Sequence, residues 1–232
     1  MRCFKSKLCK FCGCGPVGWR CHNLNMLVLA SASPRRRQLL AQAGFTFAVR
    51  PAHLPEDPKP GEDPIIYVTR LAREKAQAVF DEIAAGAECE VPDAIGPCVT
   101  DLQSLAVLGA DTTVTLDGHI LGKPENREDA ARILRMLSGR SHRVITGVAL
   151  VTQQGVEVAA ETTAVRFLTL SDEEIEAYIA TGEPMDKAGA YGIQGLAAKW
   201  IPRVEGCYFN VMGLPLALVA TMLGNRGISG AH

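Results

Sequence analysis

The stretch Met26-Leu27-Val28-Leu29-Ala30-Ser31-Ala32-Ser33-Pro34-Arg35-Arg36 decides the fold class of this 232-residue chain. Its first five residues are apolar, which predicts a buried β-strand, and small residues then lead directly into a helix. Ser33 is a helix-capping residue type, and Pro34 fits the first helical position because its missing N–H costs nothing there. A buried strand that passes at once into a helix is typical of an α/β protein.

The start of this helix is also a predicted anion site. Its first turn directs free backbone N–H groups and the positive end of the helix dipole toward one point. Arg35 and Arg36 add fixed charges and forked N–H donors at the same place, and phosphate is the anion that suits such donors. The alternative is an ordinary helix start with solvated arginines, and this segment alone does not separate the two.

The rest of the chain alternates between predicted strands and helices. Apolar periodicity and capping residues predict further helices from Asp63-Pro64 onward and over residues 126–137, 171–180 and 211–223. Apolar runs predict further strands over residues 45–49, 105–110, 144–151 and 156–170. Asp117-Gly118 is typical of a hairpin turn. We therefore expect an α/β fold with a mixed, twisted sheet flanked by helices, in two lobes with a central cleft.

Composition excludes some classes of function. The formal net charge of -1 gives no electrostatic footprint for nonspecific nucleic-acid binding, which requires a clearly basic domain. No apolar run reaches the roughly 18 residues needed to span a bilayer, and the N-terminus is too polar for a signal peptide. We expect a soluble cytoplasmic protein with no nucleic-acid or membrane partner. A homodimer through the final helix and the hairpin is compatible with the sequence.

The first 25 residues differ in composition from the remainder. Five of the eight cysteines lie within residues 1–21, and His22 follows them. These residues supply enough ligands for a zinc-dependent interaction module, but their spacing is cramped for one tetrahedral ion. The alternative is a disordered leader or a translation start placed too early, with Met26 as the initiator. We divide the chain into this leader (1–25), one domain (26–224) with a surface insertion at 86–104, and a tail (225–232).

A set of charged side chains predicts metal and phosphate chemistry. Asp111 follows the apolar strand 105–110, so we expect it at that strand's end and directed into a cleft, although an aspartate there can also be a simple loop cap. Candidates for the same cleft are Glu56 in a proline-rich loop, Glu74 and Lys75 on the long helix, and Lys123 in Gly122-Lys123-Pro124. Carboxylates beside phosphate-binding cations suit Mg²⁺, which takes few protein oxygens and can prepare an attacking water.

A glycine-rich segment, Asp186-Lys187-Ala188-Gly189-Ala190-Tyr191-Gly192-Ile193-Gln194-Gly195, is the second unusual stretch. Its glycines indicate close approach of the backbone to something flat or anionic. The Gln194 amide offers a donor and an acceptor, as the edge of a pyrimidine requires. The alternative is a plain loop between two elements. The stretch has neither the Walker ending nor a dinucleotide-binding fingerprint.

Five motifs in order resemble one family. They are Leu29-Ala30-Ser31-Ala32-Ser33-Pro34-Arg35-Arg36, Arg70-Leu71-Ala72-Arg73-Glu74-Lys75-Ala76, Gly109-Ala110-Asp111-Thr112, Gly122-Lys123-Pro124 and the glycine-rich segment 186–195. Together they closely resemble the Maf family of nucleoside triphosphate pyrophosphatases, from about Met26 to Leu223. The resemblance implies metal-dependent hydrolysis of a nucleoside triphosphate between its α- and β-phosphates, with Mg²⁺, Mn²⁺ or Co²⁺ as the divalent cation.

The resemblance also implies residue roles. Asp111 matches the proton acceptor, and Glu56 matches a loop carboxylate that holds the metal together with Asp111, although the acidic run of the family is reduced here to His53-Leu54-Pro55-Glu56. Phosphate contacts are implied for Ser33, Arg36, Lys75, Lys123 and Lys187. Substrate selection is implied for Arg35, Thr112 and Gln194.

The segment Gly192-Ile193-Gln194-Gly195 resembles the branch of the family that acts on dTTP and UTP, and modified pyrimidine nucleotides are further candidate substrates. An amide suits a pyrimidine edge, and a pocket that must hydrogen-bond its base rejects mismatched bases strongly. Two alternatives remain at this point. One is a pyrophosphatase of the 7-methyl-GTP branch, and the other is a noncatalytic nucleotide-binding regulator of cell division that could dispense with Asp111.

Overall fold

The computed structural model describes residues 26–86 and 102–230. Within these ranges seven strands form one mixed sheet in the order β2-β1-β3-β5-β6-β7, and β4 pairs with β3 outside that path. The strands are β1 (Met26–Leu29), β2 (Ala48–Val49), β3 (Leu105–Leu116), β4 (His119–Leu121), β5 (Ser141–Thr152), β6 (Gly155–Arg166) and β7 (Arg203–Glu205). β1 is parallel to β2 and β3, and the remaining pairs are antiparallel. The expected mixed sheet is confirmed.

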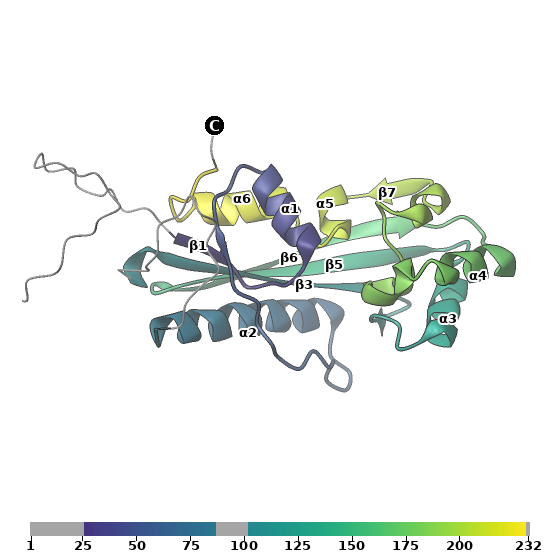
Figure 1. Cartoon of the computed structure of the whole chain (residues 1–232), viewed down its shortest axis with the longest axis horizontal. Helices are drawn as coiled ribbons and strands as arrows, with labels where there is room; N and C mark the ends of the chain where they lie inside the picture. Colours follow the sequence, from purple (N-terminus) through teal and green to yellow (C-terminus); the bar gives the residue numbers. More distant parts are fainter. Residues whose placement is uncertain (1–25, 87–101, 231–232) are drawn as a thin grey trace, which may run out of the picture.

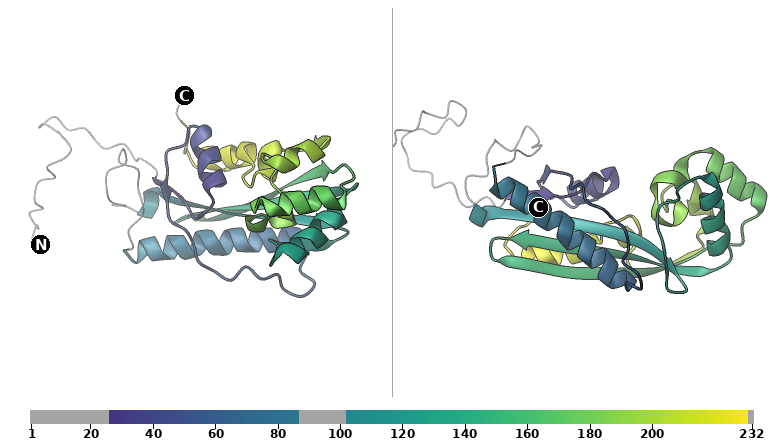
Figure 2. Two further views of the ribbon diagram at one scale, coloured as in Figure 1. Left: turned by 45° about the vertical axis from the view of Figure 1, so that its right-hand side comes forward. Right: turned by 90° about the horizontal axis from the view of Figure 1, so that it is seen from below.

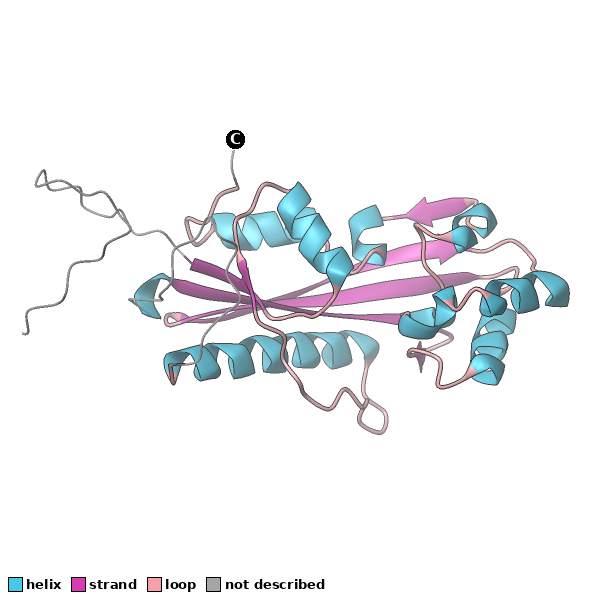
Figure 3. Cartoon of the chain, viewed as in Figure 1, coloured by secondary structure: helices cyan, strands magenta, loops and turns pink. Residues whose placement is uncertain are grey.

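Helices cover both faces of the sheet (Figures 1 and 3). They are α1 (Pro34–Gln42), α2 (Pro64–Ala84), α3 (Arg127–Leu137), α4 (Asp172–Ala180), α5 (Tyr208–Val211) and α6 (Leu216–Gly224), with short 3-10 turns η1 (Leu102–Ser104), η2 (Glu183–Asp186), η3 (Ala188–Ala190) and η4 (Leu196–Trp200). The long α2 lies along one face, and α1 and α6 lie on the other. No helix within the described ranges is long and apolar enough to cross a membrane.

Capping residues explain where the predicted helices begin. The Ser33 hydroxyl accepts the backbone N–H of Arg36 at 3.5 Å, with Pro34 in the first helical position. Asp63 caps α2 in the same way, by accepting backbone N–H groups of its first turn. Ser171 and Glu174 form the reciprocal capping box that begins α4. Each of these side chains satisfies helix N–H groups that have no partner within the helix.

Two lobes share the sheet, as Figure 2 shows from two further directions. In the first lobe, α1 and α6 bury Leu39, Leu40, Val219, Met222 and Leu223 against one face, while α2 buries Val79 and Ile83 against the other. In the second lobe, α3 and α4 pack against the far ends of β3 and β5. The 12-residue strands β3, β5 and β6 run from one lobe into the other, so the two lobes form one body.

Three sequence expectations need correction. β3 does not end at residue 110 but continues to Leu116, so Asp111 lies in the middle of the strand. The strand expected over 156–170 ends at Arg166. The helix expected over 211–223 is interrupted at Gly213 and Pro215, and it is divided into α5 and α6. Residues 1–25, with the candidate zinc ligands, and residues 87–101 of the expected insertion lie outside the described residues.

Candidate active site

A notch in the edge of the sheet opens the cleft between the lobes. On one side of β3, β1 pairs only as far as Leu108, and β4 begins to pair at Val114. Within the described part of the chain, no strand pairs with residues 109–113 on that side. Asp111 therefore reaches the cleft because β3 lacks a neighbour there, and not because the strand ends. Side chains from both faces of the sheet can converge on this gap, since they alternate along a strand.

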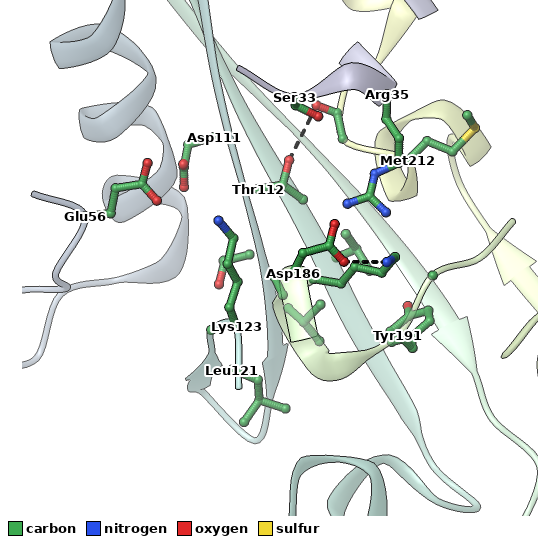
Figure 4. Close-up of a pocket in the computed structure, with 18 of the residues that line it drawn as sticks. Ser33, Arg35, Glu56, Asp111, Thr112, Leu121, Lys123, Asp186, Tyr191 and Met212 are labelled. Atoms are coloured by element: carbon green, nitrogen blue, oxygen red, sulfur yellow. Dashed lines mark hydrogen bonds and ion pairs between the residues drawn. The ribbon is translucent and has the colours of Figure 1, made fainter. Parts of the chain in front are cut away.

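The cleft has a volume of about 1050 Å³ and draws its walls from both lobes. The β1–α1 turn, the proline-rich loop, β3, the segment after β4 and the glycine-rich segment all line it. Ten predicted site residues lie in this lining: Ser33, Arg35, Arg36, Glu56, Lys75, Asp111, Thr112, Lys123, Lys187 and Gln194. Glu74, the other candidate for the cleft, is not part of it and pairs instead with Arg70 at 3.2 Å. Figure 4 shows Glu56, Asp111 and Lys123 on one side, with Arg35, Asp186 and Tyr191 on the other.

Lys75 lies between two carboxylates in the lining of the cleft. Its Nζ is 2.7 Å from Asp111 Oδ1 and 2.5 Å from Glu56 Oε1. The Lys75 and Asp111 side chains are 7% and 9% exposed, whereas the Glu56 side chain is 48% exposed. Asp111 therefore depends on protein groups for its solvation, whereas Glu56 retains contact with water.

The two carboxylates differ in their proton affinity. Burial raises the pKa of Asp111 above its ordinary value, although the charges of Lys75 and Arg36 oppose that rise. Burial also acts to raise the pKa of Glu56, but the hydrogen bond and charge of Lys75 outweigh it, so the net pKa is lowered. A raised pKa suits a carboxylate that accepts a proton, and a lowered pKa suits one that stays ionised.

This donor set fits a divalent cation with few protein ligands. Asp111 and Glu56 already share one cation, the Lys75 ammonium. Within residues 26–86 and 102–230, no group of three or more His, Cys, Asp or Glu side chains is placed to hold a metal ion. Two carboxylates are nevertheless enough for Mg²⁺, which commonly retains several waters and completes its octahedron with substrate phosphates.

Arg36 occupies the positive side of the cleft at the start of α1. Its Nε donates to Gly213 O at 2.8 Å, Nη1 to Ser31 Oγ at 3.2 Å and Nη2 to Thr112 Oγ1 at 3.0 Å. Desolvation lowers the pKa of Arg36, while the charges of Asp111 and Glu56 act to raise it. Three bonds fix the plane of the guanidinium, and its remaining N–H groups can still donate to a ligand.

Thr112 is part of this network and not a free side chain. Its Oγ1 lies 2.9 Å from Thr146 Oγ1 in addition to the contact with Arg36. Thr146 in turn donates to Asn210 O in α5. A change at Thr112 would therefore move Arg36 as well as any base contact.

The other predicted cations lie around the rim. Lys123 is exposed and extends toward Asp111 and Glu56 (Figure 4), and its charge helps to lower the pKa of Glu56. Lys187 Nζ donates to Glu183 O at 2.6 Å and to Asp186 Oδ1 at 2.5 Å, so a phosphate would have to share or displace these acceptors. Arg35 lies near Asp186, on the same side of the cleft (Figure 4).

Gln194 lies at the tip of a turn. The backbone N–H of Gly195 donates to Gly192 O at 3.0 Å, which places Ile193 and Gln194 at the two central positions. The Gln194 side chain is exposed, and we find no hydrogen bond from it to any residue in the described ranges. Its amide is therefore free for a ligand in the cleft.

Sequence reasoning missed several supporting residues. Ser31 and the Gly213 carbonyl orient Arg36, and Tyr67 Oη donates to Glu56 O at 2.7 Å, which ties the proline-rich loop to α2. Gly213 sits at the break within the helix predicted over 211–223, and Pro215, expected in the first turns of that helix, instead lies just before α6. Nothing in the sequence pattern indicates the partner of Tyr67.

A helix N-terminus, fixed cations and paired carboxylates around one cleft are features that suit a phosphorylated ligand with a bound cation. Comparison with known proteins agrees. Residues 26–226 match the model of the Maf-like protein family, and the chain belongs to the Maf family.

Its relatives include proteins named dTTP/UTP pyrophosphatase. The one from Koribacter versatilis is 50% identical over 208 residues, which covers 89% of this chain and 98% of that protein. The one from Hahella chejuensis is 48% identical, covering 87% of this chain and 92% of its own length. The one from Pelotomaculum thermopropionicum is also 48% identical, covering 87% and 96%.

Proposed function

We propose that this protein is a nucleoside triphosphate pyrophosphatase that hydrolyses dTTP and UTP to the monophosphate and pyrophosphate. The observation that carries the proposal is the buried Asp111–Lys75 pair, joined by the half-exposed Glu56, in one cleft with Arg36 and Lys123. The names of the relatives support the same activity and substrate class.

Asp111 is the proposed proton acceptor. It takes one proton from a water molecule, whose oxygen forms a bond to the α-phosphorus while the bond between that phosphorus and the bridging oxygen breaks. The electron pair of the broken bond leaves with pyrophosphate. A divalent cation held by Glu56 and Asp111 would neutralise phosphate charge and lower the pKa of a bound water. The raised pKa of Asp111 supports its role because a base works best near the operating pH.

The cations divide the charge of the triphosphate. The start of α1, with Ser33 and Arg36, offers backbone N–H groups, a dipole and a fixed guanidinium on one side. Lys75, Lys123 and Lys187 are the other proposed phosphate ligands. Lys75 is paired with both carboxylates. To contact a phosphate, its ammonium must either leave one carboxylate or donate to the phosphate and the carboxylates at the same time.

Base selection is assigned to Arg35, Thr112 and Gln194. The exposed Gln194 amide can pair with the donor and acceptor edge of uracil or thymine. Thr112 acts on the base either by direct contact or through Arg36, whose guanidinium it helps to position. Arg35 also lines the cleft.

The proposal extends to the setting of the enzyme. We place the catalytic unit in residues 26–224, with 225–232 as a tail and 86–104 as an insertion, and the enzyme in the cytoplasm. Its partner is a nucleotide and not a nucleic acid, in line with the formal net charge of -1. A homodimer stays a prediction, which light scattering would test. Deleting residues 1–25 should leave turnover unchanged, whereas bound zinc in the intact chain would identify the leader as a metal module.

The decisive test measures pyrophosphate release from dTTP, UTP, CTP and 7-methyl-GTP with Mg²⁺, Mn²⁺ or Co²⁺. We expect turnover of dTTP and UTP, and a fall in kcat of at least about 100-fold in Asp111→Asn, as expected for loss of a general base. Asp117→Asn is the matched control, because Asp117 is an exposed aspartate in the turn of the β3–β4 hairpin and pairs with Arg140 on the surface. Its rate should equal that of the unaltered protein.

The alternatives predict other outcomes. Preference for 7-methyl-GTP would assign the protein to the 7-methyl-GTP branch of the family. Nucleotide binding without turnover would favour a regulatory role. Equal rates for the unaltered protein and Asp111→Asn would exclude the proposed mechanism.

A further inference from the structure

We infer that Tyr178 and Glu183 act as positioning residues that set base selectivity by holding the turn that carries Gln194. The inference rests on the proposed function and deepens it. Neither residue belongs to the motifs that indicated the site. Both come from the second lobe, Tyr178 from α4 and Glu183 from η2.

The turn is tied down at both of its ends by one connected pair of side chains. The backbone N–H of Gly192 donates to Tyr178 Oη at 3.2 Å in a buried position. The backbone N–H of Leu196, just after the turn, donates to Glu183 Oε2 at 3.1 Å. Tyr178 Oη in turn donates to Glu183 Oε1 at 2.9 Å. The hydroxyl and the carboxylate thus close a loop of hydrogen bonds beneath Ile193 and Gln194.

The fit of the carboxylate against the turn is close. A Cβ atom built on Gly195 would overlap the carboxylate of Glu183, so the absence of a side chain there lets the carboxylate lie against the backbone. Two glycines flank the tip of the turn and give its backbone more freedom than other residues would. A flexible turn needs external anchors to present one side chain in one direction.

The anchors themselves are held. Tyr178 is 3% exposed, and its ring packs edge-on against Trp200, with ring centroids 5.1 Å apart. Glu183 O accepts Lys187 Nζ at 2.6 Å, which connects the base side of the cleft to a proposed phosphate ligand. Because both anchors are fixed, the backbone position from which the Gln194 side chain extends is set before a nucleotide binds. Such preorganisation matters most for selectivity, since a site that must hydrogen-bond its base rejects a mismatched one strongly.

Three variants test the inference. Glu183→Ala removes the anchor of Leu196 and the acceptor of Tyr178, and Tyr178→Phe removes the acceptor of the Gly192 N–H. Glu183→Gln is the conservative variant, because its amide oxygen can still accept the Leu196 N–H and its amide N–H can donate to the Tyr178 hydroxyl. Ile175→Val is the control, since it trims a buried side chain of the same helix and touches none of the three hydrogen bonds.

The measurement is kcat and KM for dTTP, UTP and CTP, together with thermal unfolding. For Glu183→Ala and Tyr178→Phe we expect KM for dTTP and UTP to rise on the order of tenfold, with the preference over CTP reduced by a similar factor and kcat nearly unchanged. Glu183→Gln should retain most of the preference, and Ile175→Val all of it.

Selectivity that stays intact in folded Glu183→Ala and Tyr178→Phe would overturn the inference. So would an equal loss of kcat on all three substrates, which would indicate a purely structural role. If Glu183→Ala does not fold, Tyr178→Phe and Glu183→Gln still decide the question. If the unaltered protein releases no pyrophosphate from dTTP or UTP, the proposed function itself fails, which is a different result.

Discussion

Replacing Lys75 by methionine tests whether a buried cation holds the site together. The variant keeps a side chain of similar length and removes the ammonium that lies 2.5 Å from Glu56 and 2.7 Å from Asp111. Glu56, with a side chain 48% exposed, can return to water, but Asp111 at 9% cannot. The cost therefore falls on Asp111.

Its size follows from the burial. Removing one partner of a buried ion pair costs about 3–5 kcal/mol, because it leaves an uncompensated charge. The charge of Arg36 also acts on Asp111, which favours the lower end, about 3 kcal/mol. For a domain of this size, each kcal/mol lowers Tm by about 2–4 °C, so Lys75→Met should lower Tm by about 6–12 °C.

The assay is thermal unfolding, with urea unfolding beside it, at pH 7 for the unaltered protein, Lys75→Met, Asp111→Asn and the double variant. The double variant has no buried unpaired charge, so we expect it to be more stable than Lys75→Met. The pKa of Asp111 should rise further in Lys75→Met. Since the folded state then retains its proton more strongly than the unfolded chain, the stability loss should be full at high pH and shrink in acid. The reasoning would be refuted if the stability losses of Lys75→Met and Asp111→Asn simply added in the double variant, or if the Tm of Lys75→Met were unchanged.

Three further predictions concern the frame of the site. Burial lowers the pKa of His142 to about 4 from 6.5, so the unfolded chain takes up a proton first as pH falls. Urea unfolding should show about 2 kcal/mol of lost stability between about pH 8 and pH 5, and none of this loss in His142→Gln. Gly109→Ala would force a Cβ into the backbone of α2, and calorimetry should show a loss of about 1–3 kcal/mol, whereas an unchanged Tm would contradict the packing. Tyr67→Phe frees the backbone of Glu56, so Mn²⁺ titration of the enzyme should show weaker binding, and unchanged affinity would argue against a metal role for that loop.

The fold class could be predicted because local rules govern it, whereas the candidate site residues were implied by the resemblance of five motifs to the Maf family. Ser33 and Pro34 specify a helix start whatever surrounds them, and the structure bears this out. The error at Asp111 arose because an apolar run was taken as the whole strand. Thr112, Thr113 and Thr115 are β-branched and continue the strand. Their polar hydroxyls interrupt the apolar run, so the hydrophobic pattern did not reveal this continuation.

Other features depend on pairings far apart in sequence. The bond between Arg36 and Gly213 joins residues 177 apart, and the bond from Leu196 to Glu183 depends on how two short turns pack. No local sequence pattern predicts such contacts, because the residues around each partner carry no information about the other partner. The break at Gly213-Leu214-Pro215 could have been predicted, but its use as an acceptor for Arg36 could not.

The pairing of β3 with β5, in which Asp111 lies opposite Gly147 and Thr112 opposite Thr146, has a consequence for evolution and engineering. Adjacent residues face opposite sides of a sheet, and here Asp111 contacts Lys75 of α2 while Thr112 contacts Arg36 of α1. Inserting or deleting one residue upstream in β3 would exchange these partners. A substitution in β3 keeps this register, whereas a change in the length of the strand would disturb the contacts of Asp111 and Thr112 together, so length variation is better tolerated in the connecting loops.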